Sequence, residues 1–419
     1  MPFLTPARLL GLGTLAFGAL APVAGAQTFT SLQQDARTGV TDVVALGRGG
    51  AVAALPTLDS PFFSNPAHLA ETRRVGFTLL GATAGVGGNV RETYDFYDAT
   101  LGPAIEEGLD GLRTSDPNRL QRIYDEAFDV GQSQKTADVA LFAPSVRARF
   151  GRVAVGAGVF GTGTARAKIS DGGAGIPYLD AYTQADMLVP VSAALDVPGL
   201  PFALSAGATA TYVQRRIGAK SGAVDTFDPD NEKLYVLRGD GVRLAVGLAG
   251  RDVGVRGFDV GVSLTDLGGA IDLSMDDSFP IEGSEDAPDD TREIAALETR
   301  FNARNAAPDL RVGAAYRLVV PYTDLFPVSN VAFTADYTSA STSEFEQSFQ
   351  AGLRGGVQAT LGGVLNLRAG LSQGMPTAGV GLSSRFARID YATFGVEDGR
   401  LLGQQNRRNH VVQIRFGLF

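Results

Sequence analysis

The residue types that most often carry out chemistry are scarce in this chain. It contains no cysteine and only two histidines, His68 and His410, which lie far apart in the sequence. Neither histidine neighbours a serine or aspartate motif typical of a hydrolase, and neither G-x-S-x-G nor H-E-x-x-H occurs. Without cysteine, disulfides and thiolate metal sites are excluded. We therefore expect a protein that is not an enzyme and has no cofactor or metal centre, with both histidines in structural or turn positions.

Carboxylates are plentiful, and two stretches concentrate them. The first is residues 98–130, with helical spacing over 117–129, and the second is residues 272–298. Carboxylate oxygens are the ligands that Ca²⁺ takes, so these stretches could bind a cation at a cell surface. A solvated acidic face is the simpler interpretation, and we favour it. The net charge of −9 and the lack of a basic run argue against a nucleic-acid partner.

The start of the chain indicates export. Arg8 precedes an apolar run from Leu9 to Leu20, and Ala24-Gly25-Ala26 forms a cleavage site of the A-x-A type. This pattern predicts a signal peptide over residues 1–26, cleaved near Ala26; a short membrane anchor is the alternative, disfavoured by the length of the run. No other segment approaches the 18 uncharged apolar residues of a transmembrane helix, which excludes a helical membrane protein.

Alternation of apolar residues with a period of two recurs from about Val75 to the last residue. It is clear in 153–159, 204–212, 242–248 and 310–318, and it indicates strands rather than helices. The pattern predicts about fourteen strands, although twelve or sixteen would also fit. The expected strands are 75–86, 137–150, 151–168, 180–197, 201–216, 240–251, 257–266, 309–319, 330–339, 347–358, 363–372, 376–386, 387–396 and 410–419.

The opposite faces of these strands carry small residues and most of the strand charges. The charges are Arg243, Asp259, Arg311, Asp336, Arg368, Asp390 and Arg415. Because an Arg or Lys facing lipid at the bilayer midplane costs about 2–4 kcal/mol, these residues should face a lumen. A soluble β-sandwich would fit the same alternation with its faces reversed. The predicted signal peptide and the connections, long after strands 1, 3, 5 and 7 and short after strands 2, 4 and 6, favour an outer-membrane β-barrel of a diderm bacterium.

The segment before the first strand differs from the rest of the chain. Asn65 is a good N-cap and Pro66 suits a first helical position, so a short helix is expected there. The glycine run 47–50 is not a phosphate loop, because no Lys-Ser/Thr follows it. The residues that stand out in this segment are Gly49, Gly50, Asp59, Asn65, Pro66 and Ala67.

In that order and spacing, these residues resemble the N-terminal segment of the FadL-like outer-membrane barrels. This superfamily includes fatty-acid transporters, the PorV/PorQ proteins of type IX secretion and TraF-type proteins. Residues 389–392, Gly395 and Asn409-His410 are similar to the C-terminal end of the PorV/PorQ and TraF branches. The resemblance does not choose a branch. It implies a hatch turn at these residues, within a hatch over residues 27–74 that fills the lumen of a fourteen-stranded transmembrane barrel over residues 75–419.

Two functions then compete. The first is binding or transport of hydrophobic small molecules in a FadL-like manner. The second is a non-enzymatic accessory or shuttle role in secretion or surface assembly, in which loops 87–136 and 267–308 dock an exported protein. Outer-membrane lipid and the barrel-assembly machinery are expected partners of either. The usual assembly signal would place Phe419 on the face of Phe416, so either the last strand ends near Phe416 or its last three residues bend away.

Overall fold

The structure is a computed structural model. It describes residues 40–72, 74–88, 90–101, 103–104, 115–131, 134–171, 177–223, 233–268, 271–280, 289–302, 308–318, 328–339, 349–397 and 406–419. The predicted signal peptide and the first part of the predicted hatch, residues 27–39, lie outside these ranges.

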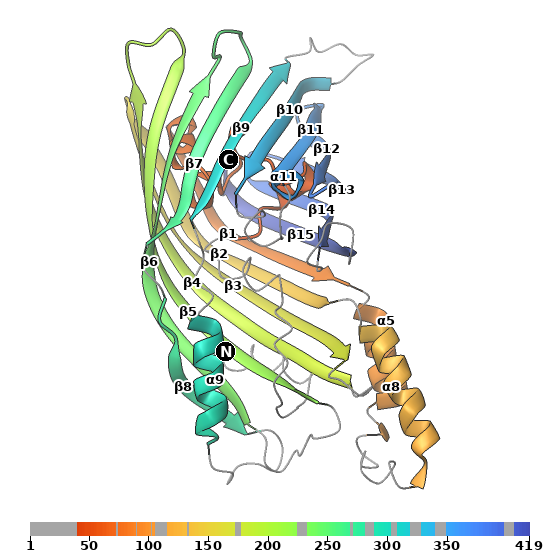
Figure 1. Cartoon of the computed structure of the whole chain (residues 1–419). Helices are drawn as coiled ribbons and strands as arrows, with labels where there is room; N and C mark the ends of the chain where they lie inside the picture. Colours follow the sequence, from red (N-terminus) through yellow and green to blue (C-terminus); the bar gives the residue numbers. More distant parts are fainter. Residues whose placement is uncertain are drawn as a thin grey trace.

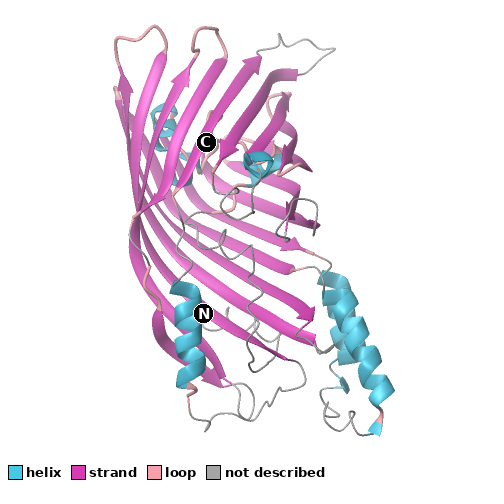
Figure 2. Cartoon of the chain, in the orientation of Figure 1, coloured by secondary structure: helices cyan, strands magenta, loops and turns pink. Residues whose placement is uncertain are grey.

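Fourteen antiparallel strands form a closed barrel, and each expected strand has its counterpart (Figures 1 and 2). The last strand pairs with the first, Ile414 opposite Ala82, which closes the wall. The predicted fourteen-stranded antiparallel barrel is therefore confirmed. The barrel strands are β1 (Val75–Gly87), β2 (Lys135–Phe150), β3 (Val153–Asp171), β4 (Pro177–Val197), β5 (Ala203–Ala223), β6 (Lys233–Arg251), β7 (Phe258–Leu267), β9 (Asp309–Leu318), β10 (Val328–Thr338), β11 (Leu353–Leu361), β12 (Leu365–Ser372), β13 (Met375–Ser383), β14 (Ala387–Glu397) and β15 (Asn406–Leu418).

The strands differ widely in length. β2 to β6 have 16 to 21 residues, whereas β9 to β13 have 8 to 11. The long strands extend past the others at the end of the barrel drawn lowest in Figure 1. The connections after β3 and β5 span residues 172–176 and 224–232 and are shorter than expected, because β3 to β6 continue beyond their predicted ends.

One end of the barrel carries short turns, such as Gly151-Arg152 between β2 and β3; we call it the short-turn end. The opposite, long-loop end carries α5 (Val90–Phe96), the π-helix η2 (Tyr97–Leu101) and α8 (Pro117–Gly131) between β1 and β2, and α9 (Thr291–Asn302) between β7 and β9. α8 covers the stretch where helical spacing was expected. A short helix, α11 (Phe349–Gly352), precedes β11. No helix in the described ranges is long and apolar enough to cross a membrane.

A fifteenth strand, β8 (Ser274–Pro280), was not predicted. It pairs with Lys233–Arg238 of β6, beyond the point where β7 leaves the wall. β6 has 19 residues and β7 only 10, so the far part of β6 would otherwise present an unpaired edge. β8 covers that edge and leads into α9.

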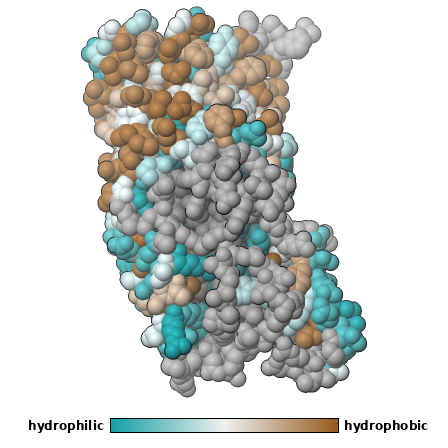
Figure 3. All heavy atoms as spheres, viewed as in Figure 1, coloured by the Kyte–Doolittle hydropathy of each residue, from teal (hydrophilic) through white to brown (hydrophobic). Residues whose placement is uncertain are grey.

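The outer surface of the wall is apolar near the short-turn end, where brown spheres predominate in Figure 3. On β15, Val412, Ile414 and Phe416 are 39–51% exposed, while Gln413 and Arg415 are 3% exposed. Side chains of this kind would be unfavourable in water as a continuous surface and suit the hydrocarbon of a bilayer. The lipid-facing parity expected for the last strand is the one observed.

The last residues differ from both expectations for them. β15 remains paired with β1 as far as Leu418, and the register shift lies on β1 between Thr78 and Leu80. Phe419 follows the strand, and the Arg388 guanidinium lies 5.6 Å from its ring centre.

Candidate functional site: the lumenal segment and the space beyond it

Residues 40–72, here called the lumenal segment, lie inside the barrel. They form α3 (Val43–Gly47), α4 (Ser60–Phe63) and a 3-10 helix, η1 (Pro66–Glu71). α3 lies against β12 to β15, and η1 lies against β3 to β6, so the segment crosses the lumen from one wall to the other. Most of its residues are buried.

Local sequence explains the two ends of the segment. The Asp42 carboxylate accepts a hydrogen bond from the Ala45 amide at 3.0 Å and caps α3. The Asn65 side-chain oxygen accepts from the Ala67 amide at 3.1 Å, and Pro66 follows as the first residue of η1. The Asn65 amide nitrogen also donates to the carbonyls of Ala53 and Leu248, at 2.9 and 3.0 Å. Asn65 therefore caps its helix and ties the segment to itself and to β6.

Glycines let the segment approach the wall. Gly49 and Gly50 have φ near +80°, a conformation that other residues rarely adopt. A Cβ atom at Gly261 would overlap the Ala53 backbone, and one at Gly207 would overlap the backbone of Pro66 and Ala67. The small residues on the inward faces of these strands thus provide room for the segment's main chain.

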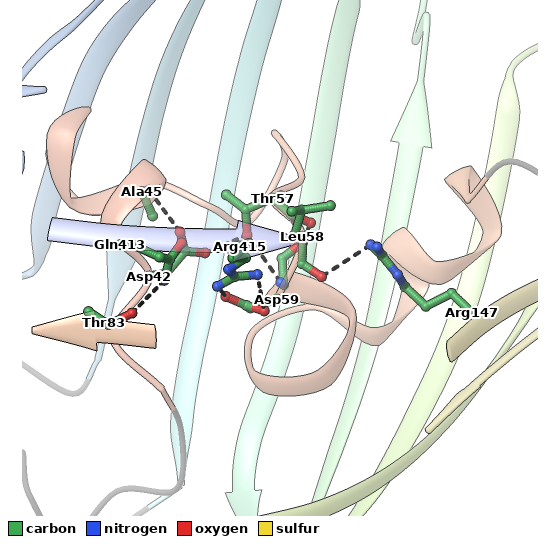
Figure 4. A network of polar contacts seen from close by, with 10 residues as sticks. Asp42, Ala45, Thr57, Leu58, Asp59, Thr83, Arg147, Gln413 and Arg415 are labelled. Carbon is green, nitrogen blue, oxygen red and sulfur yellow. Dashed lines mark hydrogen bonds and ion pairs between the residues drawn. The ribbon is translucent and has the colours of Figure 1, made fainter. Parts of the chain in front are cut away.

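A buried ion pair joins the segment to the last strand (Figure 4). Arg415 of β15 donates to both Asp59 carboxylate oxygens, through Nη1 at 2.8 Å and through Nη2. The two side chains are 3% and 7% exposed, and the Arg415 guanidinium also lies 4.2 Å from the Phe142 ring centre. Arg147 of β2 donates to the Leu58 carbonyl at 3.3 Å from the other side. The Asp59 carboxylate is therefore paired with a guanidinium in a place that water does not reach, so loss of either partner would leave a buried charge without compensation.

Among the other expected lumen charges, Asp336 contacts the segment directly by hydrogen bonds. It accepts from the amides of Val52 and Ala53, at 2.5 and 2.6 Å. The rest lie within the wall. Arg368 pairs with Asp390 at 2.9 Å, Asp259 with Arg317 at 2.5 Å and Arg311 with Asp309 at 2.7 Å, and Arg243 is 4% exposed.

Arg48 is a residue of the site that the sequence did not indicate. Its side chain is 1% exposed, and it donates to the carbonyls of Ala51 and Leu55 at 2.9 and 2.5 Å. Burial lowers the pKa of this guanidinium to about 10, and nearby Asp42 and Asp336 oppose that shift. Its sequence signal is the single positive charge within the otherwise apolar and glycine-rich residues 43–56.

The two histidines lie in different environments, one buried in the lumenal segment and one on the outer face of the barrel. His68 is buried in η1, with Nδ1 3.0 Å from the Ser60 hydroxyl. Burial, aided by the charge of Arg48, lowers the pKa of His68 to about 3, so the ring is neutral. His410 lies on the outer face of β15, where its Nδ1 is 2.8 Å from the Tyr391 hydroxyl.

A cavity of about 400 Å³ lies on the long-loop side of the lumenal segment. Val52, Leu46 and Phe63 contribute apolar surface from the segment, and charged wall residues such as Asp186 and Arg311 line the sides. The cavity is thus bounded by both kinds of surface.

An apolar cluster inside the long strands is the largest feature that the sequence analysis missed. It extends from Phe62 of α4 to Leu297 and Phe301 of α9. Its buried members are Phe62, Ala140, Phe142, Phe160, Tyr182, Leu188, Val213, Ile217, Ala219, Tyr235, Leu237, Ile271, Leu273, Leu297 and Phe301. Its signal was available in the sequence: Phe160, Val213 and Ile217 have the same parity as the inward charges, where apolar residues were not expected.

Ion pairs hold α9 over this cluster. Glu293 accepts from Lys220 at 2.9 Å, and Arg300 donates to both oxygens of Asp180 at 2.9 Å. The Tyr182 and Phe301 rings are 6.1 Å apart. α9 is therefore fixed to β4 and β5 by both charge and packing.

A metal centre would require several His, Cys, Asp or Glu side chains close together. Within the residues that the structure describes, no group of three or more His, Cys, Asp or Glu could hold a metal ion.

In comparisons with known proteins, this chain is similar to solved structures but to no family model or curated sequence. No family model and no curated protein matches the sequence. The toluene transporter TbuX of Ralstonia pickettii is similar at 15% identity and a TM-score of 0.46, over 90% of this chain and 98% of that one. The toluene transporter TodX of Pseudomonas putida gives 11% and 0.48, over 91% and 98%. A FadL homologue of Pseudomonas aeruginosa gives 12% and 0.42, over 91% and 99%.

Similarity at this level concerns the fold and does not identify a ligand or a mechanism for this chain. The PorV/PorQ and TraF branches suggested by the sequence stay predictions.

Proposed function

We propose that the chain is an outer-membrane barrel that passes hydrophobic small molecules and is closed by the lumenal segment, which acts as a movable hatch. The apolar cluster carries this proposal. A barrel lumen is normally polar, whereas fifteen buried residues of this cluster extend without interruption from α9 to α4 of the segment. Such a surface binds apolar molecules and offers little to sugars or ions.

The cluster leads to the hatch rather than past it. Phe160 contacts both Phe62 and Phe63, with ring centres 5.7 and 5.0 Å apart. Phe63 also lines the cavity. An apolar molecule that enters beneath α9 would reach the segment by way of these rings, and displacement of the segment would open the way to the short-turn end.

Uptake by proteoliposomes tests the proposal. Vesicles containing the barrel should take up an apolar fluorescent probe faster than vesicles without it, while glucose, a polar solute, should not enter. Asn in place of Leu188, which is fully buried in the cluster, should slow probe uptake. Equal uptake with and without the barrel would refute the proposal.

The alternative role in secretion stays a prediction. Co-purification of an exported protein with the barrel, in the absence of bound apolar ligand, would favour it over transport.

A further inference from the structure

Three arginines lie near Asp59 towards the short-turn end of the lumen, and Arg415 alone among them bonds to its carboxylate in the described structure. Arg415 of β15 and Arg388 of β14 are directly opposite each other across the two strands. Like charges in such a cross-strand pair destabilise a sheet. Arg147 of β2 approaches the same point from beyond β1, and Arg147 and Arg415 are 7% and 3% exposed. This arrangement places three positive charges together.

The carboxylates near these arginines already have partners. Asp42 accepts from the Ala45 amide and from the Thr57 hydroxyl. Asp59 gives both of its oxygens to Arg415. Asp390, which follows Arg388 by two residues, pairs with Arg368 at 2.9 Å. Arg147 donates a hydrogen bond to the Leu58 carbonyl, and the Arg388 guanidinium lies 5.6 Å from the Phe419 ring centre. Among the residues that the structure describes, neither Arg147 nor Arg388 forms an ion pair with a carboxylate.

Donor groups at this point also lack acceptors. The Nε atoms of Arg147, Arg388 and Arg415 are all buried without a hydrogen-bond partner in the structure. Buried polar groups are normally satisfied, and an unpaired charged donor is costly. Single Nε atoms of this kind also occur at Arg243 and Arg317. Three of them on neighbouring arginines favour an acceptor with negative charge at this point.

We propose that Arg147, Arg388 and Arg415 form a binding site for a small organic carboxylate. The planar guanidinium fork matches a carboxylate in geometry and charge, as the Arg415–Asp59 pair already shows. A bound carboxylate would share Arg415 with Asp59, so its binding weakens the hold on the lumenal segment. The site does not depend on the proposed passage of apolar molecules, because binding can be measured without transport.

Calorimetric titration of the full chain in a nonionic detergent at low ionic strength tests the site. Benzoate should bind saturably, benzyl alcohol should not, and added salt should weaken the binding of benzoate. Arg388→Gln should weaken it by about tenfold, the loss expected for a charge-assisted hydrogen bond. Arg408→Gln is the matched control, because Arg408 donates to Thr393 on β14 at 2.8 Å and lies away from the cluster. Absence of saturable binding, or equal affinity in Arg388→Gln, would overturn the proposal.

Asp59→Asn tests whether the ligand shares Arg415. The variant keeps the shape of the side chain and removes its charge, so benzoate should bind several-fold more tightly. Unchanged or weaker binding to the folded variant would overturn the shared site. If Asp59→Asn does not show the heat-dependent gel mobility of a folded barrel, Arg388→Gln alone decides.

Discussion

The wall meets most of the lumenal segment through close main-chain contacts at glycines, a buried ion pair and small apolar clusters, whereas it meets α9 through one large apolar cluster flanked by ion pairs. At the segment, Gly207 and Gly261 touch main chain and Arg415 holds Asp59. Beneath α9, Tyr182 and Leu188 belong to an apolar cluster. The contacts of the lumenal segment depend on specific geometry. Because they all lie on residues 40–72, the segment can leave the wall as a unit. The apolar interface beneath α9 is non-directional and can accept an apolar guest.

The largest expected effect that separates the two interfaces is at Asp59. Asp59→Ala leaves Arg415 buried without its partner, which should cost the docked segment about 3–5 kcal/mol. Hydrogen exchange of residues 40–72 should rise sharply, while exchange of α9 stays unchanged. Asp289→Ala is the control: its pair with Lys233 has a carboxylate that is 48% exposed, and such pairs contribute about 1 kcal/mol or less. Equal effects of the two variants would contradict the distinction.

A polar substitution in the apolar cluster should have the converse effect. Leu188→Asn buries an amide among apolar side chains and loses a buried Leu, at a cost of roughly 3 kcal/mol. Thermal stability and uptake of an apolar probe should both fall, with exchange of residues 43–58, none of which belongs to the cluster, unchanged. Increased exchange in the segment would show that the two interfaces are one cooperative unit.

A smaller effect is expected from crowding the wall beneath the segment. Gly261→Ala places a methyl group against the Ala53 backbone, and such overpacking costs about 1–3 kcal/mol. Protease cleavage within residues 40–72 should become faster. Gly161→Ala is the control, since a Cβ atom there meets nothing within 4 Å. Equal cleavage rates in the two variants would argue against tight contact at Gly261.

The smallest expected effect concerns pH. Burial lowers the pKa of His68 from 6.5 to about 3, so the released segment takes up that proton first and docking weakens as pH falls below 6.5. Burial raises the pKa of Glu71 from 4.5 to about 6, so the docked segment takes up that proton first and docking strengthens as pH falls from 6 towards 4.5. The two effects oppose each other.

Between pH 7 and pH 5, wild-type docking should therefore change little. Glu71→Gln removes the compensating effect and should lose about 1.4 kcal/mol more than wild type over this interval, the value of one pKa unit. Exchange of residues 40–72 at both pH values measures the difference. An identical pH response of variant and wild type would show that Glu71 does not compensate for His68.

The strands could be predicted from the sequence because one face of each must meet lipid, which enforces alternation. The prediction stopped short in β3 to β6, whose far ends lie beyond the apolar outer surface. β8 was missed because it is a seven-residue strand, Ser274–Pro280, with acidic residues at its centre. β8 forms because it pairs with the open edge of β6, and the local sequence of β8 contains no pattern that predicts this pairing.

The site was predictable only in part. Asn65 and Pro66 predict the start of a helix from local sequence alone. Asp59 was identified through the family resemblance, but the partner of Asp59, Arg415, lies 356 positions away in the sequence. Alternation placed Arg415 inside the lumen without identifying its partner. The apolar cluster was not predicted because inward-facing residues were expected to be small or charged. Phe160 and Ile217 are large apolar residues at inward-facing positions, and they could have indicated the cluster.

Passage of apolar molecules through this barrel requires the lumenal segment to move, if the segment is a hatch. Val43 and Ala392 are both fully buried in one cluster between α3 and β14, and the chain has no cysteine of its own. Val43→Cys combined with Ala392→Cys should form a disulfide that locks the segment to the wall, with Val43→Cys alone as control. We predict that probe uptake into proteoliposomes falls to the level of empty vesicles when the disulfide forms and recovers on reduction. Undiminished uptake with the disulfide fully formed would contradict the account.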